Sequence, residues 1–216
     1  MTQEEQVQTN QTQTSSAAQQ VQQVVQPLQQ APLLEEESSG IDILEWVFKI
    51  INHWYLFVIA AITYLLTIEP TASFWDCGEF IASSYKLEVG HPPGNPVFQL
   101  FARFFTMFFD NMHAAVAVNA MNAICSALTI FFLYLTIVFF AKRVVKPSDD
   151  GTYTVGKAVA IFGSGAVGAL AYCFSDTFWF SAVEGEVYAM SSLFTALVFW
   201  AMIKWYEQAE TPYANR

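Results

Sequence analysis

The chain has 216 residues, of which 54% are hydrophobic and 13% are charged, and its formal net charge is −10. A soluble domain carries about 25% charged residues, so this composition excludes a purely soluble globular protein. No basic stripe exists to meet phosphates, which argues against a nucleic-acid partner. The cysteines are odd in number and far apart (Cys77, Cys125 and Cys173), which excludes a disulfide framework and a cysteine-based zinc site.

Residues 1–40 are rich in glutamine and contain an acidic run but few large apolar side chains. Such a segment buries too little surface to offset its ordering entropy, so we predict a disordered cytoplasmic tail. We predict one transmembrane module over residues 41–216, which begins with a short amphipathic helix at 41–49. Nothing closes the bundle after the last apolar run. We therefore expect the module to be incomplete, with the rest of a longer chain or a larger membrane complex as its partner.

Uncharged apolar runs determine the fold class. A helix that spans a bilayer needs about 20 mostly apolar residues, and a backbone in lipid must satisfy its own hydrogen bonds. We therefore predict an all-α, polytopic membrane protein whose four transmembrane helices occupy Ile50–Ile68, Ala114–Ala141, Ala158–Ser175 and Val187–Ile203.

A fifth apolar run, Asn95–Phe109, contains an arginine and is shorter. Its polar members fall on one helical face, which predicts an amphipathic helix at the membrane interface; they are Asn95, Gln99, Arg103 and Thr106. If this run does not span, seven of the nine Lys and Arg residues lie on one side. The positive-inside rule makes that side cytoplasmic. Both termini are then cytoplasmic, and the outer loops are 69–113 and 176–186.

The first outer loop carries two acids three residues apart, Asp76 and Glu79, which share a helical face. One interpretation is acid–base chemistry, in which a carboxylate accepts a proton from an incoming hydroxyl. The other is a capping box at the start of a helix that runs to Val89. The sequence leaves both open.

A proline-rich turn follows this predicted helix. We expect Gly90 to end the helix, Pro92 and Pro93 to fix the turn, and Pro96 to begin the next helix. His91 is then held on a stiff backbone near Asp76. Its alternative role is a hydrogen bond within the turn alone.

The second outer loop contains Glu184 and Glu186, which are either solvated loop charges or part of a site shared with Asp76. The glycines between residues 163 and 168 match a dinucleotide-binding pattern, but inside a membrane span small residues indicate close helix packing. A polar stripe on the second span is interpreted as a source of hydrogen bonds between helices. It consists of Asn119, Asn122, Ser126 and Thr129.

Three segments carry a resemblance to a known family: 74–82 with 85–87, Gly90-His91-Pro92-Pro93-Gly94, and 182–188. They resemble a bacterial membrane family of unknown function that is similar to the protein O-mannosyltransferases, and the chain is identified as a member of the GT-C glycosyltransferase superfamily. The resemblance covers about residues 45–216. Members of that family are several times longer, so this chain matches the N-terminal part of their transmembrane module.

The resemblance implies an inverting transfer of a sugar from a polyprenyl-phosphate donor to a hydroxyl acceptor, a protein Ser or Thr or a glycan. It implies that the reaction takes place on the outer face of the membrane, which we expect to be the bacterial inner membrane. It implies Asp76 as the catalytic base, with Glu79 as the fallback, and neither a metal nor another cofactor. The leaving phosphate needs cationic or N–H partners. We expect these to be Arg103, His91 and Lys86, with Glu184 and Glu186 lining the acceptor side.

Two other functions compete with this one. The chain is instead a structural or assembly subunit if the Asp76 motif only caps a helix. A transporter is disfavoured, because transporters carry ionisable groups within the membrane and the four runs hold none except His53, near one end of the first.

Overall fold

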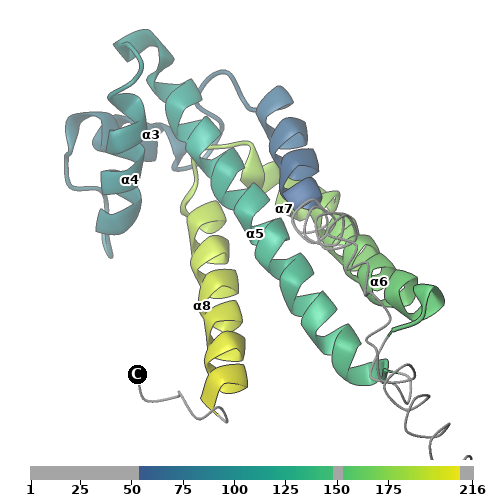
Figure 1. The fold of residues 1–216 in the computed structure, drawn as a ribbon. Coiled ribbons are helices and arrows are strands. Elements are labelled where there is room, and N and C mark those ends of the chain that lie inside the picture. Colours follow the sequence, from purple (N-terminus) through teal and green to yellow (C-terminus); the bar gives the residue numbers. More distant parts are fainter. Residues whose placement is uncertain (1–53, 148–152, 210–216) are drawn as a thin grey trace, which may run out of the picture. The chain divides into compact units, whose positions relative to one another are not determined.

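The computed structural model describes residues 54–147 and 153–209, and every regular element in these ranges is a helix (Figure 1). The predicted tail at 1–40 and the predicted helix at 41–49 lie outside the described residues. The helices are Trp54–Leu66, α3 Cys77–Lys86, α4 Pro96–Thr106, η1 Asn111–His113, α5 Ala114–Val144, α6 Val155–Cys173, α7 Asp176–Ala182 and α8 Val187–Ala209.

Three helical segments are long and apolar enough to cross a membrane: Asn111–Val144, Val155–Cys173 and Val187–Ala209. They confirm the predicted second, third and fourth spans and the all-α polytopic class. In the predicted first span, the structure describes a shorter apolar helix, Trp54–Leu66. Its 13 residues measure about 20 Å, less than the roughly 30 Å of a bilayer core, and residues 50–53 lie outside the described part.

Helix α5 contacts each of the other labelled helices and is the centre of the described bundle. Helix α6 packs closely against it through glycines, as the small-residue pattern predicted. A Cβ added at Gly165 would lie 2.6 Å from Val138 Cγ2, and one added at Gly168 would lie 2.8 Å from Ile137 Cδ1. The predicted packing role is therefore confirmed for Gly165 and Gly168, whereas a Cβ added at Gly163 would meet no atom within 4 Å.

Helices α3 and α4 form a hairpin beside one end of α5 (Figure 1). Helix α4 has eleven residues, about 16 Å, which is too short to cross a bilayer. Its inner face buries Phe98 and Ala102, whereas Leu100 and Phe104 on its outer face are 62% and 57% exposed. It is the amphipathic helix that the sequence predicted.

The end of α3 differs from the prediction. The helix ends at Lys86, and Leu87 adopts a left-handed conformation with φ 55°. The N–H of Glu88 donates to the carbonyl of Ser83 over 2.8 Å, the bond that closes a helix in a Schellman motif. Leu87 therefore ends the helix, and the predictions that it runs to Val89 and that Gly90 ends it were wrong.

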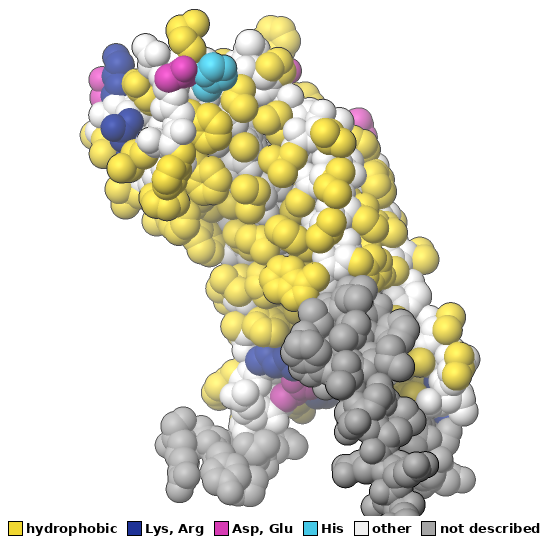
Figure 2. Space-filling view, turned by 45° about the horizontal axis from the view of Figure 1, so that its top comes forward, with side chains coloured by type: hydrophobic (Ala, Val, Ile, Leu, Met, Phe, Trp, Pro, Cys, Tyr) yellow, Lys and Arg dark blue, Asp and Glu magenta, His cyan; other side chains and the backbone are white. Residues whose placement is uncertain are grey.

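Charged side chains gather toward the two ends of the described bundle, and hydrophobic side chains cover much of the face between them (Figure 2). Both predicted outer loops lie at the end that carries α3 and α4. Lys142 and Arg143 lie in the last turn of α5, at its opposite end. This separation of the loops from the basic cluster is the arrangement that the sequence predicted from charge.

Candidate active site

Asp76 stands at the N-cap position of α3, directly after a sharp turn. Trp75 has φ 63°, a value that bulky residues rarely adopt. A capping aspartate normally accepts a hydrogen bond from the first turn, but the Asp76 side chain accepts none and is 57% exposed. The structure therefore does not form the capping box that the sequence allowed.

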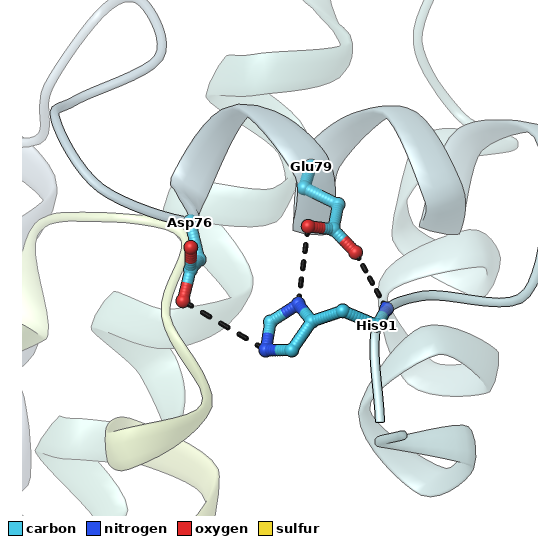
Figure 3. Close-up of side chains that lie close together, drawn as sticks. All are labelled: Asp76, Glu79 and His91. Atoms are coloured by element: carbon cyan, nitrogen blue, oxygen red, sulfur yellow. Dashed lines mark hydrogen bonds and ion pairs between the residues drawn. The ribbon is translucent and has the colours of Figure 1, made fainter. Parts of the chain in front are cut away.

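His91 connects the two carboxylates (Figure 3). Its backbone N–H donates to Glu79 Oε1 over 2.7 Å, and its ring Nδ1 lies 3.1 Å from Glu79 Oε2. Its other ring nitrogen, Nε2, lies 3.9 Å from Asp76 Oδ2. The predicted proximity of His91 to Asp76 is present, and the histidine bonds a carboxylate of α3 rather than the turn alone.

The hydrogen bonds from the backbone and ring of His91 lower the pKa of Glu79. A carboxyl whose folded pKa is lowered contributes stability above its unfolded pKa and loses it as the pH falls through the folded value. The hydrogen bonds between Glu79 and His91 therefore weaken under acidic conditions, as the Glu79 carboxylate is protonated. Gly90 lets the backbone before His91 lie close to the Glu79 and Gln99 side chains. A Cβ added at Gly90 would lie 3.3 Å from Glu79 Oε1 and 3.2 Å from Gln99 Nε2.

Ligand atoms of Asp76, Glu79 and His91 lie within 4.8 Å of one another, close enough to surround one cation. All three side chains are exposed, and His91 already occupies both oxygens of Glu79. Glu79 and His91 are thus hydrogen-bonded to each other, and Asp76 contacts His91 at 3.9 Å. The expectation of a metal-independent enzyme stays a prediction.

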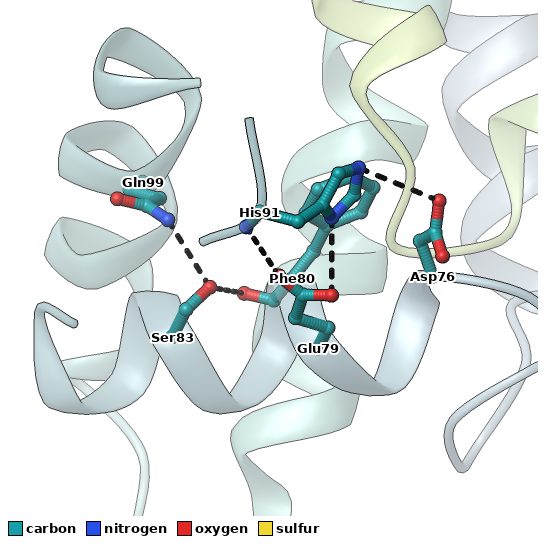
Figure 4. Close-up of polar contacts among 6 residues, drawn as sticks. All are labelled: Asp76, Glu79, Phe80, Ser83, His91 and Gln99. Carbon is teal, nitrogen blue, oxygen red and sulfur yellow. Dashed lines mark hydrogen bonds and ion pairs between the residues drawn. The ribbon is translucent and has the colours of Figure 1, made fainter. Parts of the chain in front are cut away.

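The side chains beneath His91 tie α3 to α4 (Figure 4). The ring of Phe80, which is buried, lies 5.9 Å from the ring of His91 at an interplanar angle of 31°. Ser83 Oγ donates to the carbonyl of Phe80 over 3.4 Å and accepts from Gln99 Nε2 over 3.2 Å. Gln99 belongs to the polar face predicted on α4, so part of this face is used for packing within the hairpin.

The structure does not bring Arg103 and Lys86 to this cluster. Arg103 donates to the carbonyl of Tyr85 and lies 5.4 Å from the centre of the Tyr85 ring. Lys86 pairs with Glu88 at 3.9 Å. Both cations therefore lie near the C-terminal end of α3, whose last residues are about 13–15 Å along the helix axis from Asp76.

Glu184 and Glu186 are only 6% and 7% exposed, so they are not solvated loop charges. Glu184 Oε2 accepts from Ser73 Oγ over 2.6 Å, and Glu186 Oε1 accepts from Cys77 Sγ over 3.3 Å. Burial is the largest cause of the raised pKa of Glu186, and the charges of Glu184 and Asp76 raise it further. The second outer loop thus lies against the segment that carries Asp76.

Cys77 follows Asp76 and is fully buried. Burial, followed by the hydrogen bond to Glu186, raises the pKa of its thiol to about 12. The thiol is therefore neutral at physiological pH and acts as a hydrogen-bond donor, not as a nucleophile. Cys77 lies within the motif, between Asp76 and Gly78, but nothing in the sequence pattern pointed to this hydrogen bond.

Two members of the predicted polar stripe on α5 bind loops rather than neighbouring helices. Asn119 Nδ2 donates to the carbonyls of Glu69 and Thr71, and Asn122 Nδ2 donates to those of Glu184 and Glu186. The interpretation that these asparagines hydrogen-bond between helices was wrong, because their partners are buried or partly buried carbonyls of loop backbone, which no helical hydrogen bond satisfies.

A cavity of about 500 Å³ opens between α5, α6 and α8. Small, hydroxyl-bearing and apolar side chains line it, including Gly168, Ser192, Thr195 and Leu133. None of the predicted site residues borders it, so this cavity and the cluster of Asp76 and His91 are separate features.

Comparison with known families resolves the relationship that the motifs suggest. Residues 76–216 match the family model described as the protein O-mannosyl-transferase TMEM260 N-terminal domain. The chain belongs to this family. The match begins at Asp76 and includes the described parts of both outer loops after that residue, the α3–α4 hairpin and the three candidate spans.

Two curated relatives of the TMEM260 family show how much of a full protein the chain represents. Protein O-mannosyl-transferase tmem260 of Dictyostelium discoideum is 26% identical over 70% of this chain and 16% of its own length. The Mus musculus protein O-mannosyl-transferase TMEM260 is 26% identical over 66% of this chain and 18% of its own length. The chain thus spans about a sixth of these relatives. No solved structure matches it.

Proposed function

We propose that the protein transfers mannose from a polyprenyl-phosphate donor to a Ser or Thr hydroxyl of a protein on the outer face of the membrane, as a GT-C-type inverting enzyme. Membership of the TMEM260 family supports mannosyl transfer. The observation that carries the proposal is the exposed carboxylate of Asp76, which serves no capping role and faces His91. The test is a transfer assay on the full-length protein with polyprenyl-phosphate mannose and acceptor peptides.

Asp76 is the proposed general base. Its carboxylate accepts the proton of the acceptor hydroxyl while the hydroxyl oxygen forms a bond to the anomeric carbon. The bond from that carbon to the phosphate oxygen breaks, and the phosphate leaves with the electron pair on the opposite face. An inverting glycosidase base activates water in the same way. Glu79 holds His91 through two contacts, and His91 in turn orients Asp76.

The leaving phosphate requires a cation on the far side of the sugar from the base. His91 lies 3.9 Å from Asp76 and so is on the side of the base. The two carboxyls of inverting glycosidases flank the sugar about 6.5–9.5 Å apart, and an interposed phosphate lengthens that span. The proposed phosphate ligands are therefore Lys86, at the C-terminal end of α3, and Arg103 of α4, whose side chain reaches that end.

Replacing Arg103 with glutamine is expected to weaken donor binding by about 1.5–3 kcal/mol, the value of a hydrogen bond to a charged group. Donor titration of the full-length variant measures this, with Lys146→Gln at the opposite end of α5 as the control. If Arg103 serves only the Tyr85 carbonyl, the variant loses stability but keeps its donor affinity, and the phosphate role is refuted.

We also propose that both termini are cytoplasmic and that the membrane is the bacterial inner membrane. The charge distribution supports the orientation. The two relatives named above are eukaryotic and give no support to the bacterial assignment, which stays a prediction.

Two valines provide a matched test of orientation, because Val89 is 96% exposed and Val155 is 81% exposed. A membrane-impermeant maleimide is expected to label Val89→Cys in intact spheroplasts, and Val155→Cys only after permeabilisation. The native cysteines are buried and give little background. Labelling of Val155→Cys alone in intact cells would reverse the topology.

A further inference from the structure

The two outer loops are joined by three successive hydrogen bonds. The N–H of Glu69 donates to the carbonyl of Val183 over 3.0 Å. Two side-chain bonds continue the series, from Ser73 to Glu184 and from Cys77 to Glu186. The two loops therefore run side by side in the same direction, because later residues of the first loop bond later residues of the second. The last bond holds Glu186 against the segment that carries the proposed base, near enough for the charge of Asp76 to raise the pKa of Glu186.

Asn122 of α5 holds the backbone of the second outer loop. Its side chain is fully buried in α5, and its amide donates to the carbonyls of Glu184 over 2.5 Å and Glu186 over 2.6 Å. An asparagine amide has two N–H donors, and both are used here. The backbone on either side of Gly185 is therefore fixed to a rigid membrane-spanning helix.

Gly185 shows how tightly this segment is seated. A Cβ added there would lie 3.0 Å from Asn119 Oδ1, 3.2 Å from Val118 Cγ1 and 3.3 Å from Ile81 Cγ1. The loop cannot shift toward α5 or α3 without a clash, and the amide of Asn122 prevents it from moving away. The backbone that carries the Glu186 side chain is consequently held in place by α5.

We infer that Asn122 is a positioning residue, which acts by holding the Glu186 carboxyl in place beside Asp76. This inference rests on the proposed transferase function. The side chain of Glu186 contacts the Cys77 thiol and the backbone N–H of Val187, whereas Asn122 is the side chain that holds the backbone carbonyls of both Glu184 and Glu186. A displacement of about 1 Å at a reacting centre can cost roughly a hundredfold in rate, so loss of this anchor should reduce turnover.

The test uses the full-length protein and the mannosyl-transfer assay. Asn122→Ala removes both donors and is expected to lower kcat at least about tenfold, while KM for donor and acceptor stays within about threefold. Ser126→Ala is the matched control, because Ser126 lies one turn along the same face, is fully buried and makes no hydrogen bond within the described residues. Its kcat should equal that of the wild type.

A double-mutant cycle with Glu186→Gln separates positioning from general destabilisation. If Asn122 acts through Glu186, the two losses in kcat are not multiplicative. Multiplicative losses, or a wild-type kcat per folded Asn122→Ala molecule, would overturn the inference. Asn122→Ser, which keeps one donor, replaces the alanine variant if that variant does not fold, and the same outcomes apply.

The proposed function and the positioning role of Asn122 can fail independently of each other. If Asp76→Asn keeps full activity, the assignment of the base fails whatever Asn122 does. If Asp76→Asn is inactive and Asn122→Ala keeps its kcat, only the positioning role is lost.

Discussion

Asp76→Asn in the full-length protein is expected to lower kcat at least about a hundredfold while the protein stays folded. General-base catalysis contributes about 10²–10⁴ in rate and needs the carboxylate. The side chain is exposed and makes no capping hydrogen bond, so the amide should change the free energy of unfolding by less than about 0.5 kcal/mol. Transfer kinetics and a thermal unfolding curve of the purified variant measure the two effects.

Asp110 supplies a matched control for this substitution. It lies at the same end of the bundle, is similarly exposed, and pairs with His113 over 2.6 Å. Asp110→Asn therefore also removes a carboxylate from beside a histidine and should leave turnover unchanged. If activity survives in Asp76→Asn but collapses in Glu79→Gln, the base is Glu79. If both variants remain active, the enzymatic interpretation of this loop fails.

Gly165→Ala is expected to destabilise the bundle by about 1–3 kcal/mol, the usual cost of overpacking. The added methyl would lie 2.6 Å from Val138 Cγ2 and 2.9 Å from Tyr134 Cε2, so α6 and α5 must separate. Gly163→Ala on the same helix meets no atom within 4 Å and should not lower stability. Thermal unfolding of both variants in detergent gives the comparison, and equal midpoints would show that α6 does not pack as described.

The sequence predicted the second, third and fourth spans correctly because bilayer thickness constrains the length of an apolar run. It predicted the wrong end for α3 because a glycine was expected to stop the helix, whereas Leu87 adopts the left-handed conformation itself. The local sequence pattern does not show which residue takes the left-handed conformation at the end of α3. It depends on the hydrogen bond from Glu88 to Ser83 and on the hairpin that follows.

The candidate site was predicted in part. The spacing of Asp76, Glu79 and His91 suggested a cluster, and the structure brings the three together. The polar faces of α4 and α5 were identified from periodicity, but their partners were not. Arg103 contacts Tyr85, and Asn122 contacts a loop more than 60 positions later in the chain. Periodicity shows which side chains share a face, whereas the residues opposite that face depend on tertiary packing.

The asparagines of α5 have a consequence for biosynthesis. Asn119 can bind Glu69 and Thr71 as soon as α5 is made, since both precede it in the chain. Asn122 forms its hydrogen bonds later, because its partners, Glu184 and Glu186, are synthesised only after α6 and α7. Until then a polar amide lies in a newly inserted helix without its acceptors, which is costly in lipid. Arrival of the α7–α8 connection removes that cost, so the insertion of α6 and the completion of the site are coupled events in the assembly of the protein.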